Sequence, residues 1–284
     1  MEIILGKTAG FCYGVKRAVE GAKEEAKIRE KVYCLGEIVH NKNVIESLEK
    51  EGIKFIENLE EARANVIIRA HGVAKEVYEQ LENKQIKVKD LTCPNVLKIH
   101  KIAEEYSKKG YFIILVGSEN HPEVIGTISF CGENSFIVQD LADIPNCTKK
   151  LEKSKSQDVL VIAQTTYNSK KFDEIVENLK INLTSKNLEI NKTICMATEV
   201  RQNETSEIAK KVDVMIIIGD KKSSNTNKLY DISSKYCKKV FFVQNEDDLK
   251  RLNLKQEEKV GIMAGASTPE DDIEMIIKFL EENN

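Results

Sequence analysis

Three cysteines occupy corresponding positions along the chain, each between a short apolar segment and a stretch with helical apolar spacing. They are Cys12 in LGKTAGFCYGV, Cys93 in VKDLTCPNV and Cys195 in EINKTICMATEV. A thiolate is a nucleophile and a ligand for soft metals. Because the three thiols stand at the same point of an internal repeat, we expect the fold to bring them to one shared site.

Metal binding is the chemistry that best suits three such thiols. Three thiols cannot all pair as disulfides, and an odd total of seven cysteines favours a reducing compartment. A structural zinc site takes four ligands from closely spaced pairs, and no CxxC occurs. Three separate thiolates suit an iron-sulfur cluster with one iron left open to substrate. The alternative, a buried small apolar side chain, is favoured for the other cysteines: Cys34, Cys131, Cys147 and Cys237.

Polar clusters end the apolar segments that come after each of the three cysteines. Several of their residues stand where a helix is expected to begin, so backbone N–H groups and the helix dipole would favour an anion there. A phosphate or diphosphate is therefore the expected ligand, although each such residue taken singly is more often a helix cap. The clusters supply His40, His71, His121, Thr165, Thr166, Ser223, Ser224, Asn225, Ser267 and Thr268.

Glu123 is the candidate proton donor. It follows His121 and Pro122 in a strand-end cluster that places an acid beside a histidine. A carboxyl enclosed among apolar and neutral polar groups has a raised pKa and can deliver a proton near neutral pH. The alternative is a solvent-facing glutamate on the next helix. The fourth histidine, His100, is expected on a helix as a packing or surface residue.

The same order of elements follows each cysteine. A helical stretch comes first, then an apolar strand, a short strand with an acidic tail, a further strand and a second helix. The acidic tails are alike: FIENLEEA, FIVQDLADI and FFVQNEDDL. Strands that alternate with helices predict parallel sheets with right-handed crossovers, and such sheets bind ligands beyond the carboxyl ends of their strands.

The repeat predicts an α/β fold of three pseudo-symmetric domains with parallel sheets around one central site. The expected units are residues 6–93, 94–192 and 193–284. The third copy lacks a closing strand, which the N-terminal segment 1–5 would supply. At 284 residues the chain is long enough to divide into domains. The polar, lysine-rich stretch 148–158 is the expected mobile loop.

Composition excludes several classes of function. The chain is 31% charged and 41% hydrophobic with a net charge of -3, which is typical of a globular protein and favours neither nucleic acid nor membrane partners. Its apolar runs have the length of strands, and the N-terminus lacks a signal-peptide pattern, so we expect a cytoplasmic protein. The motif GxxxxGK[ST] is absent, which argues against a Walker-type nucleotide site. A GxG dinucleotide fingerprint is absent too, which argues against a nicotinamide dehydrogenase.

A series of motifs, nearly end to end, resembles the 4-hydroxy-3-methylbut-2-enyl diphosphate reductases of the methylerythritol phosphate route to isoprenoids. In chain order they are GFCYGVKRAV, GEIVHN, RAHGV, TCPNVLKIH, HPEVIGT, AQTT, TICMATEVRQ, SSNTNKL and GASTPE. The resemblance implies an oxygen-sensitive oxidoreductase with a [4Fe-4S] cluster in a central cavity. Cys12, Cys93 and Cys195 would be its ligands, with one iron not ligated by protein. The implied catalytic residues are Glu123 and Thr165, and the implied substrate contacts are His40, His71, His121, Thr165, Ser223, Ser224, Asn225 and Ser267.

The implied reaction is the reductive dehydroxylation of (E)-4-hydroxy-3-methylbut-2-enyl diphosphate to isopentenyl and dimethylallyl diphosphate. A low-potential donor such as ferredoxin or flavodoxin would supply electrons, and we expect a monomer. Asn120 and Ser129 stand where the family usually has glycine, so the conformation and mobility of the loop around His121 are expected to differ from the family pattern. Two alternatives are a non-catalytic iron-sulfur sensor or electron carrier, which would leave Glu123 unexplained, and a zinc-dependent hydrolase of a phosphorylated metabolite.

Overall fold

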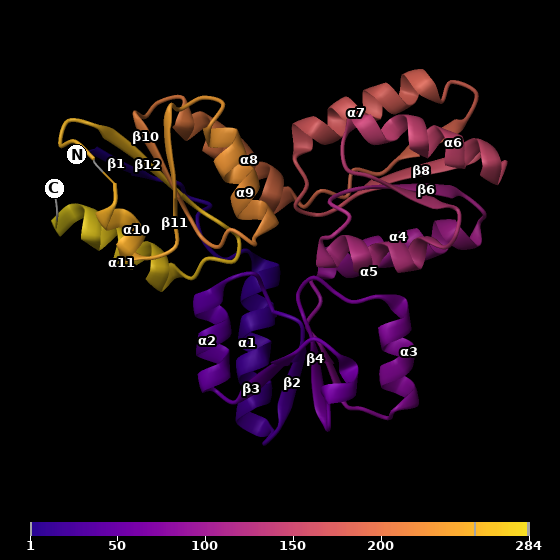
Figure 1. Ribbon diagram of the computed structural model, residues 1–284, viewed down its shortest axis with the longest axis horizontal. Helices are drawn as coiled ribbons and strands as arrows, with labels where there is room; N and C mark the ends of the chain where they lie inside the picture. The colour runs from indigo at the N-terminus through magenta and orange to yellow at the C-terminus, as the bar shows by residue number, and fades with distance from the viewer. Residues whose placement is uncertain (1, 253, 283–284) are drawn as a thin grey trace. The chain divides into compact units, whose positions relative to one another are not determined.

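The computed structural model describes residues 2–252 and 254–282. Within these ranges the strands form three four-stranded sheets in which every pairing is parallel (Figure 1), so the predicted fold class is confirmed. The strand orders are β3-β2-β4-β5, β7-β6-β8-β9 and β11-β10-β12-β1. The order is the same in each sheet, with β1 at the edge position that β5 and β9 occupy in the other two.

The strands are four to six residues long except for β5, which has three. The first sheet contains β2 (Val32–Leu35), β3 (Ile53–Ile56), β4 (Asn65–Ile68) and β5 (Val88–Asp90). The second contains β6 (Phe112–Val116), β7 (Ser135–Val138), β8 (Asp158–Ala163) and β9 (Asn187–Ile190). The third contains β10 (Val214–Ile218), β11 (Lys239–Val243), β12 (Lys259–Ala264) and β1 (Glu2–Leu5).

The helices repeat in the same order as the strands. One helix directly follows each repeated cysteine: α1 (Tyr13–Ile28), α4 (Pro94–Lys108) and α8 (Met196–Ala209). The helices after the first strand of each copy are α2 (Lys42–Lys50), α5 (Pro122–Cys131) and α9 (Ser224–Ser233). Those after the third strand are α3 (Lys75–Asn83), α7 (Ser169–Asn182) and α11 (Glu270–Glu282). Between the second and third strands lie η1 (Leu59–Glu61), η2 (Leu141–Asp143), α6 (Ile144–Ser154) and α10 (Glu246–Lys250).

The acidic tails of the three copies are helix caps. Asn58, Asp140 and Asn245 each accept a hydrogen bond from a backbone N–H at the start of η1, η2 or α10. Asparagine and aspartate are preferred there because the side-chain oxygen pairs an N–H that the helix itself leaves unpaired. The sequence likeness of these tails therefore has a local structural cause.

The expected loop over residues 148–158 is instead helical as far as Ser154. Ile144, Cys147 and Leu151 are buried on one side of α6, at the spacing of a helix face. The lysines between them gave this segment its polar composition, but an amphipathic helix has that composition on its exposed face. Lys155, with a φ of 57°, ends the helix in the left-handed conformation.

The sheet of β6 to β9 shows how the core forms. Alternate residues of β6 point to opposite faces: Phe112, Ile114 and Val116 pack with α6 and α7, whereas Ile113 and Leu115 pack with α4 and α5. Figure 1 shows these two helix pairs on the two faces of this sheet. Both faces are covered, which explains why its central strands read as continuous apolar runs.

The chain forms two compact units. One combines the N-terminal segment up to Lys16, residues 39–47 and the chain from Met196 onward, and it holds the sheet that β1 completes. The other combines residues 17–38 and 48–195 and holds the other two sheets. The domain boundaries expected at residues 93/94 and 192/193 stay predictions. Among the described residues, no helix has the length and apolar character needed to span a membrane.

Candidate active site

The three repeated cysteines have equivalent backbone anchors. The backbone N–H of each cysteine donates a hydrogen bond to a carbonyl that lies two residues beyond the end of a strand. The strand is the third of its copy: β12 for Cys12, β4 for Cys93 and β8 for Cys195. Cys12 donates to Ala266 O (3.2 Å), Cys93 to Ala70 O (3.0 Å) and Cys195 to Thr165 O (3.0 Å). The repeat inferred from the sequence thus extends to the hydrogen bonds that position the three thiols. These bonds lie at the carboxyl ends of the strands, where parallel sheets bind their ligands.

The environments of the seven cysteines divide them into two groups. Cys12, Cys93 and Cys195 are partly exposed, whereas the other four are buried, as expected. Burial raises the pKa of Cys34, Cys131 and Cys147 to about 12, which disfavours the thiolate that a metal requires. The partly exposed set is therefore the one whose chemistry fits an iron-sulfur cluster.

A buried arginine holds the segment that leads to Cys12. Arg201 on α8 is only 4% exposed. Its Nε donates to Thr8 O and its Nη2 to Gly10 O, both at 2.7 Å. One turn further along α8, the Glu204 carboxylate accepts hydrogen bonds from the N–H groups of Lys7 (2.7 Å) and Thr8 (2.9 Å). The helix that follows Cys195 thus fixes the backbone that precedes Cys12.

Replacing Arg201 by leucine should lower the free energy of unfolding by about 2–3 kcal/mol, because one buried and one part-buried carbonyl lose a charged donor. Arg201→Lys should recover only part of this loss, since an ammonium lacks the guanidinium fork. Urea denaturation of the cluster-free protein measures both effects. A wild-type midpoint for Arg201→Leu would show that the arginine is not needed to hold the segment.

Glu123 and Thr165 form a buried pair. Glu123 is 2% exposed. The Thr165 backbone N–H donates to Glu123 Oε1 at 2.6 Å, and the Thr165 hydroxyl donates to Oε2 at 2.7 Å. Burial raises the pKa of Glu123 to about 7, although the two bonds from Thr165 lower it. The carboxyl can thus hold a proton near neutral pH, and the hydroxyl beside it can both accept and donate one.

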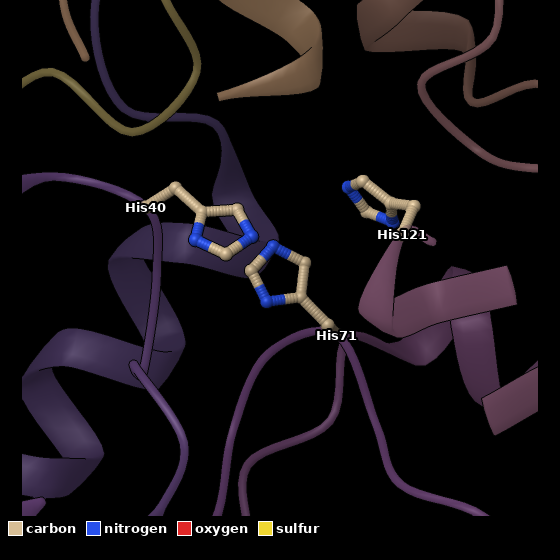
Figure 2. A group of neighbouring side chains, drawn as sticks. All are labelled: His40, His71 and His121. Carbon is tan, nitrogen blue, oxygen red and sulfur yellow. The ribbon is translucent and has the colours of Figure 1, made fainter. Parts of the chain in front are cut away.

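Two histidines lie together near this pair. His121 is the N-cap of α5, and its Nδ1 accepts a hydrogen bond from Glu123 N at 3.2 Å. A neutral His121 must then carry its proton on Nε2, which is a donor. The His71 ring, on the loop after β4, meets the His121 ring edge to face with 5.4 Å between centroids (Figure 2). Both rings therefore present nitrogen atoms at the carboxyl ends of parallel strands.

His40 and Ser267 meet in the other compact unit. The Ser267 hydroxyl donates to the His40 carbonyl oxygen at 3.0 Å. The next residue, Asn41, caps α2 by accepting a hydrogen bond from Val44 N at 3.1 Å. The contact joins the loop after β12 to the residue that precedes this cap.

Ser223, Ser224 and Asn225 form the start of α9. Ser223 is its N-cap, and the Ser223 hydroxyl oxygen accepts a hydrogen bond from Thr226 N at 3.3 Å. Asn225 is 3% exposed, and neither Oδ1 nor Nδ2 has a hydrogen-bond partner. A buried unpaired amide is costly to the fold. At a helix N-terminus, where an anion is favoured, this cost is explained if the amide pairs with a ligand.

Replacing Asn225 by leucine should leave the free energy of unfolding unchanged or raise it by about 1 kcal/mol, because an unpaired buried amide is removed. The same change should weaken binding of a diphosphate ligand about tenfold or more, since that amide is the expected partner of the ligand. Calorimetric titration with inorganic diphosphate and urea denaturation measure the two quantities. A loss of stability without a loss of affinity would assign Asn225 a purely structural role.

Two sequence features outside the site have structural roles. His100 is 4% exposed and stacks on Phe130 at a centroid distance of 4.3 Å, so of the two expected roles, packing or surface, it has the packing one. Burial lowers the pKa of His100 to about 4, so it is neutral at physiological pH. The Ser129 hydroxyl oxygen accepts a hydrogen bond from Lys75 N at 2.8 Å and donates to Gly126 O at 2.6 Å. This departure from the family pattern therefore joins the start of α3 to α5.

The predicted site residues fall in both compact units, each described by itself. Within one unit the structure brings together Glu123, Thr165 and Cys195, and also His71 and His121. Within the other it brings His40 to Ser267. Arg201 and Glu204 were not predicted as site residues. Both lie in or beside the motif TICMATEVRQ, but their partners are about 200 positions away in the sequence, so no local pattern reveals them.

Three copies of one parallel sheet, each with a cysteine placed before a helix, define an α/β protein built by internal repetition. More particularly, the chain belongs to the LytB family, since the family model described as LytB protein matches residues 3–281. The resemblance inferred from the motifs is therefore confirmed.

Relatives named 4-hydroxy-3-methylbut-2-enyl diphosphate reductase match nearly the whole chain. One from Caldanaerobacter subterraneus subsp. tengcongensis is 43% identical over 287 residues, which cover 99% of this chain and 97% of the relative. One from Clostridioides difficile is 40% identical over 284 residues, with 99% of each chain covered.

Solved structures share the fold. The E-1-hydroxy-2-methyl-but-2-enyl-4-diphosphate reductase of Plasmodium falciparum superposes with a TM-score of 0.91 at 33% identity, covering 98% of this chain and 87% of that one. A second, titled (E)-4-hydroxy-3-methyl-but-2-enyl diphosphate reductase and described as the terminal enzyme of the non-mevalonate pathway, has a TM-score of 0.71 at 39% identity. It covers 99% of this chain and 100% of its own.

Proposed function

We propose that the chain reduces (E)-4-hydroxy-3-methylbut-2-enyl diphosphate to isopentenyl and dimethylallyl diphosphate. Its family and the names of its relatives support this activity. The observation that carries the proposal is the position of Thr165. Its carbonyl accepts the hydrogen bond of Cys195 N, while its N–H and hydroxyl both bind the Glu123 carboxyl. One residue thus joins a candidate proton source to a candidate cluster ligand.

Cys12, Cys93 and Cys195 are proposed to hold a [4Fe-4S] cluster in which one iron has no protein ligand. The equivalent anchors of these cysteines and their partial exposure support this assignment. When bound, such a cluster passes electrons to the substrate and offers a Lewis-acidic iron for its hydroxyl group.

The proposed diphosphate ligands are neutral donors. His121 offers Nε2–H beside the start of α5, and Asn225 has an unpaired amide at the start of α9. Backbone N–H groups at a helix N-terminus add to the attraction for an anion. The full proposed set is His40, His71, His121, Thr165, Ser223, Ser224, Asn225 and Ser267.

Glu123 is the proposed source of protons. Loss of the substrate hydroxyl as water requires one proton, and a second must reach carbon, so the reaction consumes two electrons and two protons. The Glu123 carboxyl can release a proton through the Thr165 hydroxyl, which accepts on one lone pair while donating its own hydrogen. Protonation at one or the other end of the allylic carbon system gives the two products.

We infer further that a low-potential protein such as ferredoxin or flavodoxin supplies the electrons, and that the enzyme acts as a cytoplasmic monomer. One chain contains every proposed ligand and catalytic residue, which supports the monomer. The odd number of cysteines supports a reducing compartment. The proposed domains are residues 6–93, 94–192 and 193–284, the last with strand 1–5.

Anaerobic incubation with substrate and a chemical low-potential reductant tests this function. Both five-carbon diphosphates should accumulate, as detected by mass spectrometry. Release of inorganic phosphate by a colourless, zinc-loaded protein would instead indicate the hydrolase. An iron-loaded protein that binds no diphosphate would indicate a sensor or electron carrier.

A further inference from the structure

The helix after each repeated cysteine contacts the segment of the next cysteine in cyclic order. On α1, Arg17 Nη1 donates to the carbonyl oxygen of Thr92, the residue before Cys93, at 3.0 Å. On α8, Arg201 holds the segment before Cys12 in the same way. Each of these contacts lies within one compact unit. Two of the three cysteine segments are thus positioned through their backbone carbonyls.

The third contact of this series is made to a sulfur atom. Asn95 lies in the first turn of α4, and its Nδ2 donates to Cys195 Sγ at 3.1 Å. Both ends of this contact are anchored. Cys93 precedes α4 with its N–H bonded to Ala70 O, and Cys195 N is bonded to Thr165 O. Helix capping does not explain this hydrogen bond, because a cap pairs a backbone group that the helix leaves unpaired, and here both partners are side chains.

We propose that Asn95 is a positioning residue that donates a hydrogen bond to the Cys195 sulfur in the cluster-loaded enzyme and raises the reduction potential of the cluster. This inference rests on the proposed function, because it takes Cys195 as a cluster ligand. Hydrogen bonds to cluster sulfurs set the potential, since they stabilise negative charge that increases when the cluster is reduced. The bond also fixes the direction in which the Cys195 side chain points.

The proposal can be tested by replacing Asn95 with leucine, which has a similar size and no donor. The equilibrium constant for one-electron reduction should fall by about two- to tenfold, the effect of one ordinary hydrogen bond. A tenfold fall lowers the midpoint potential by about 59 mV. Lys98→Leu, an exposed position on the same helix, is the matched control and should keep the wild-type potential. Redox titration monitored by electron paramagnetic resonance measures all three proteins.

A second measurement tests the contact without the cluster. In the cluster-free protein, Cys195→Ala should shift the side-chain amide resonances of Asn95, whereas Cys237→Ala should not. An unchanged potential in iron-loaded Asn95→Leu, or an amide resonance indifferent to Cys195→Ala, would overturn the role of Asn95 and leave the proposed function standing. A wild-type protein that binds no iron would overturn the proposed function and the tuning role together.

Discussion

Glutamine in place of Glu123 is expected to lower turnover by about two orders of magnitude or more, because the reaction would lose its proposed general acid. The fold should persist, since a glutamine carbonyl can accept the Thr165 N–H and its amide can donate to the Thr165 hydroxyl. Iron content and diphosphate affinity should therefore stay near wild type. Anaerobic steady-state kinetics with a chemical reductant measures the change.

Glu119→Gln is the matched control, because Glu119 is an exposed acid on the loop that leads into α5. It should retain full turnover. If Glu123→Gln also turned over at the wild-type rate, another group would deliver the proton, and the pairing of Glu123 with Thr165 would have a structural role only.

The pH profile gives the same residue a second test. Burial raises the pKa of Glu123 from 4.5 to about 7, so wild-type turnover should fall as the pH rises through about 7 and the carboxyl loses its proton. This limb should be missing from the residual activity of Glu123→Gln. Because the folded-state pKa is raised, the contribution of Glu123 to stability is fully present below pH 4.5 and is lost as the pH rises through about 7.

Serine in place of Cys93 is expected to remove most of the bound iron. Serine is a preferred helix N-cap, so the start of α4 should be retained while the thiolate is lost. Cys147→Ala, which removes a buried thiol of the core, should keep its iron. Iron and sulfide analysis after anaerobic purification compares the two. A complete four-iron spectrum from Cys93→Ser would contradict the ligand assignment.

Much of the fold could be predicted because each copy of the repeat contains short apolar runs that are recognisable as strands. Apolar runs such as FIILV and VMIII become β6 and β10, which are buried on both faces. Because the third copy lacks a closing strand in the sequence, the N-terminal segment was predicted to supply it. The structure confirms this, since β1 pairs with β12 from Glu2 to Leu5. The prediction of a loop at residues 148–158 was wrong because the polar residues of α6 lie on its exposed face, while its buried residues have helical spacing.

The candidate catalytic and ligand residues could be proposed from the sequence because histidine, cysteine and a proline-flanked glutamate at strand ends are chemically distinctive. The residues that position them could not. Arg17, Asn95 and Arg201 are ordinary helix residues by composition, and their partners lie between 75 and 193 positions away. Only the tertiary structure shows that each holds a cysteine or its segment.

We propose that Cys12, Cys93 and Cys195 hold a cluster with one open iron that acts on an allylic diphosphate. This proposal is tested most directly by following the electron paramagnetic resonance and Mössbauer spectra of the anaerobic, iron-loaded protein during titration with the hydroxylated substrate. One iron of a four-iron cluster should change its spectrum in proportion to bound substrate, while Cys93→Ser should show no such cluster. A cluster whose irons all keep their spectra at saturating substrate would rule out an open iron that binds the substrate.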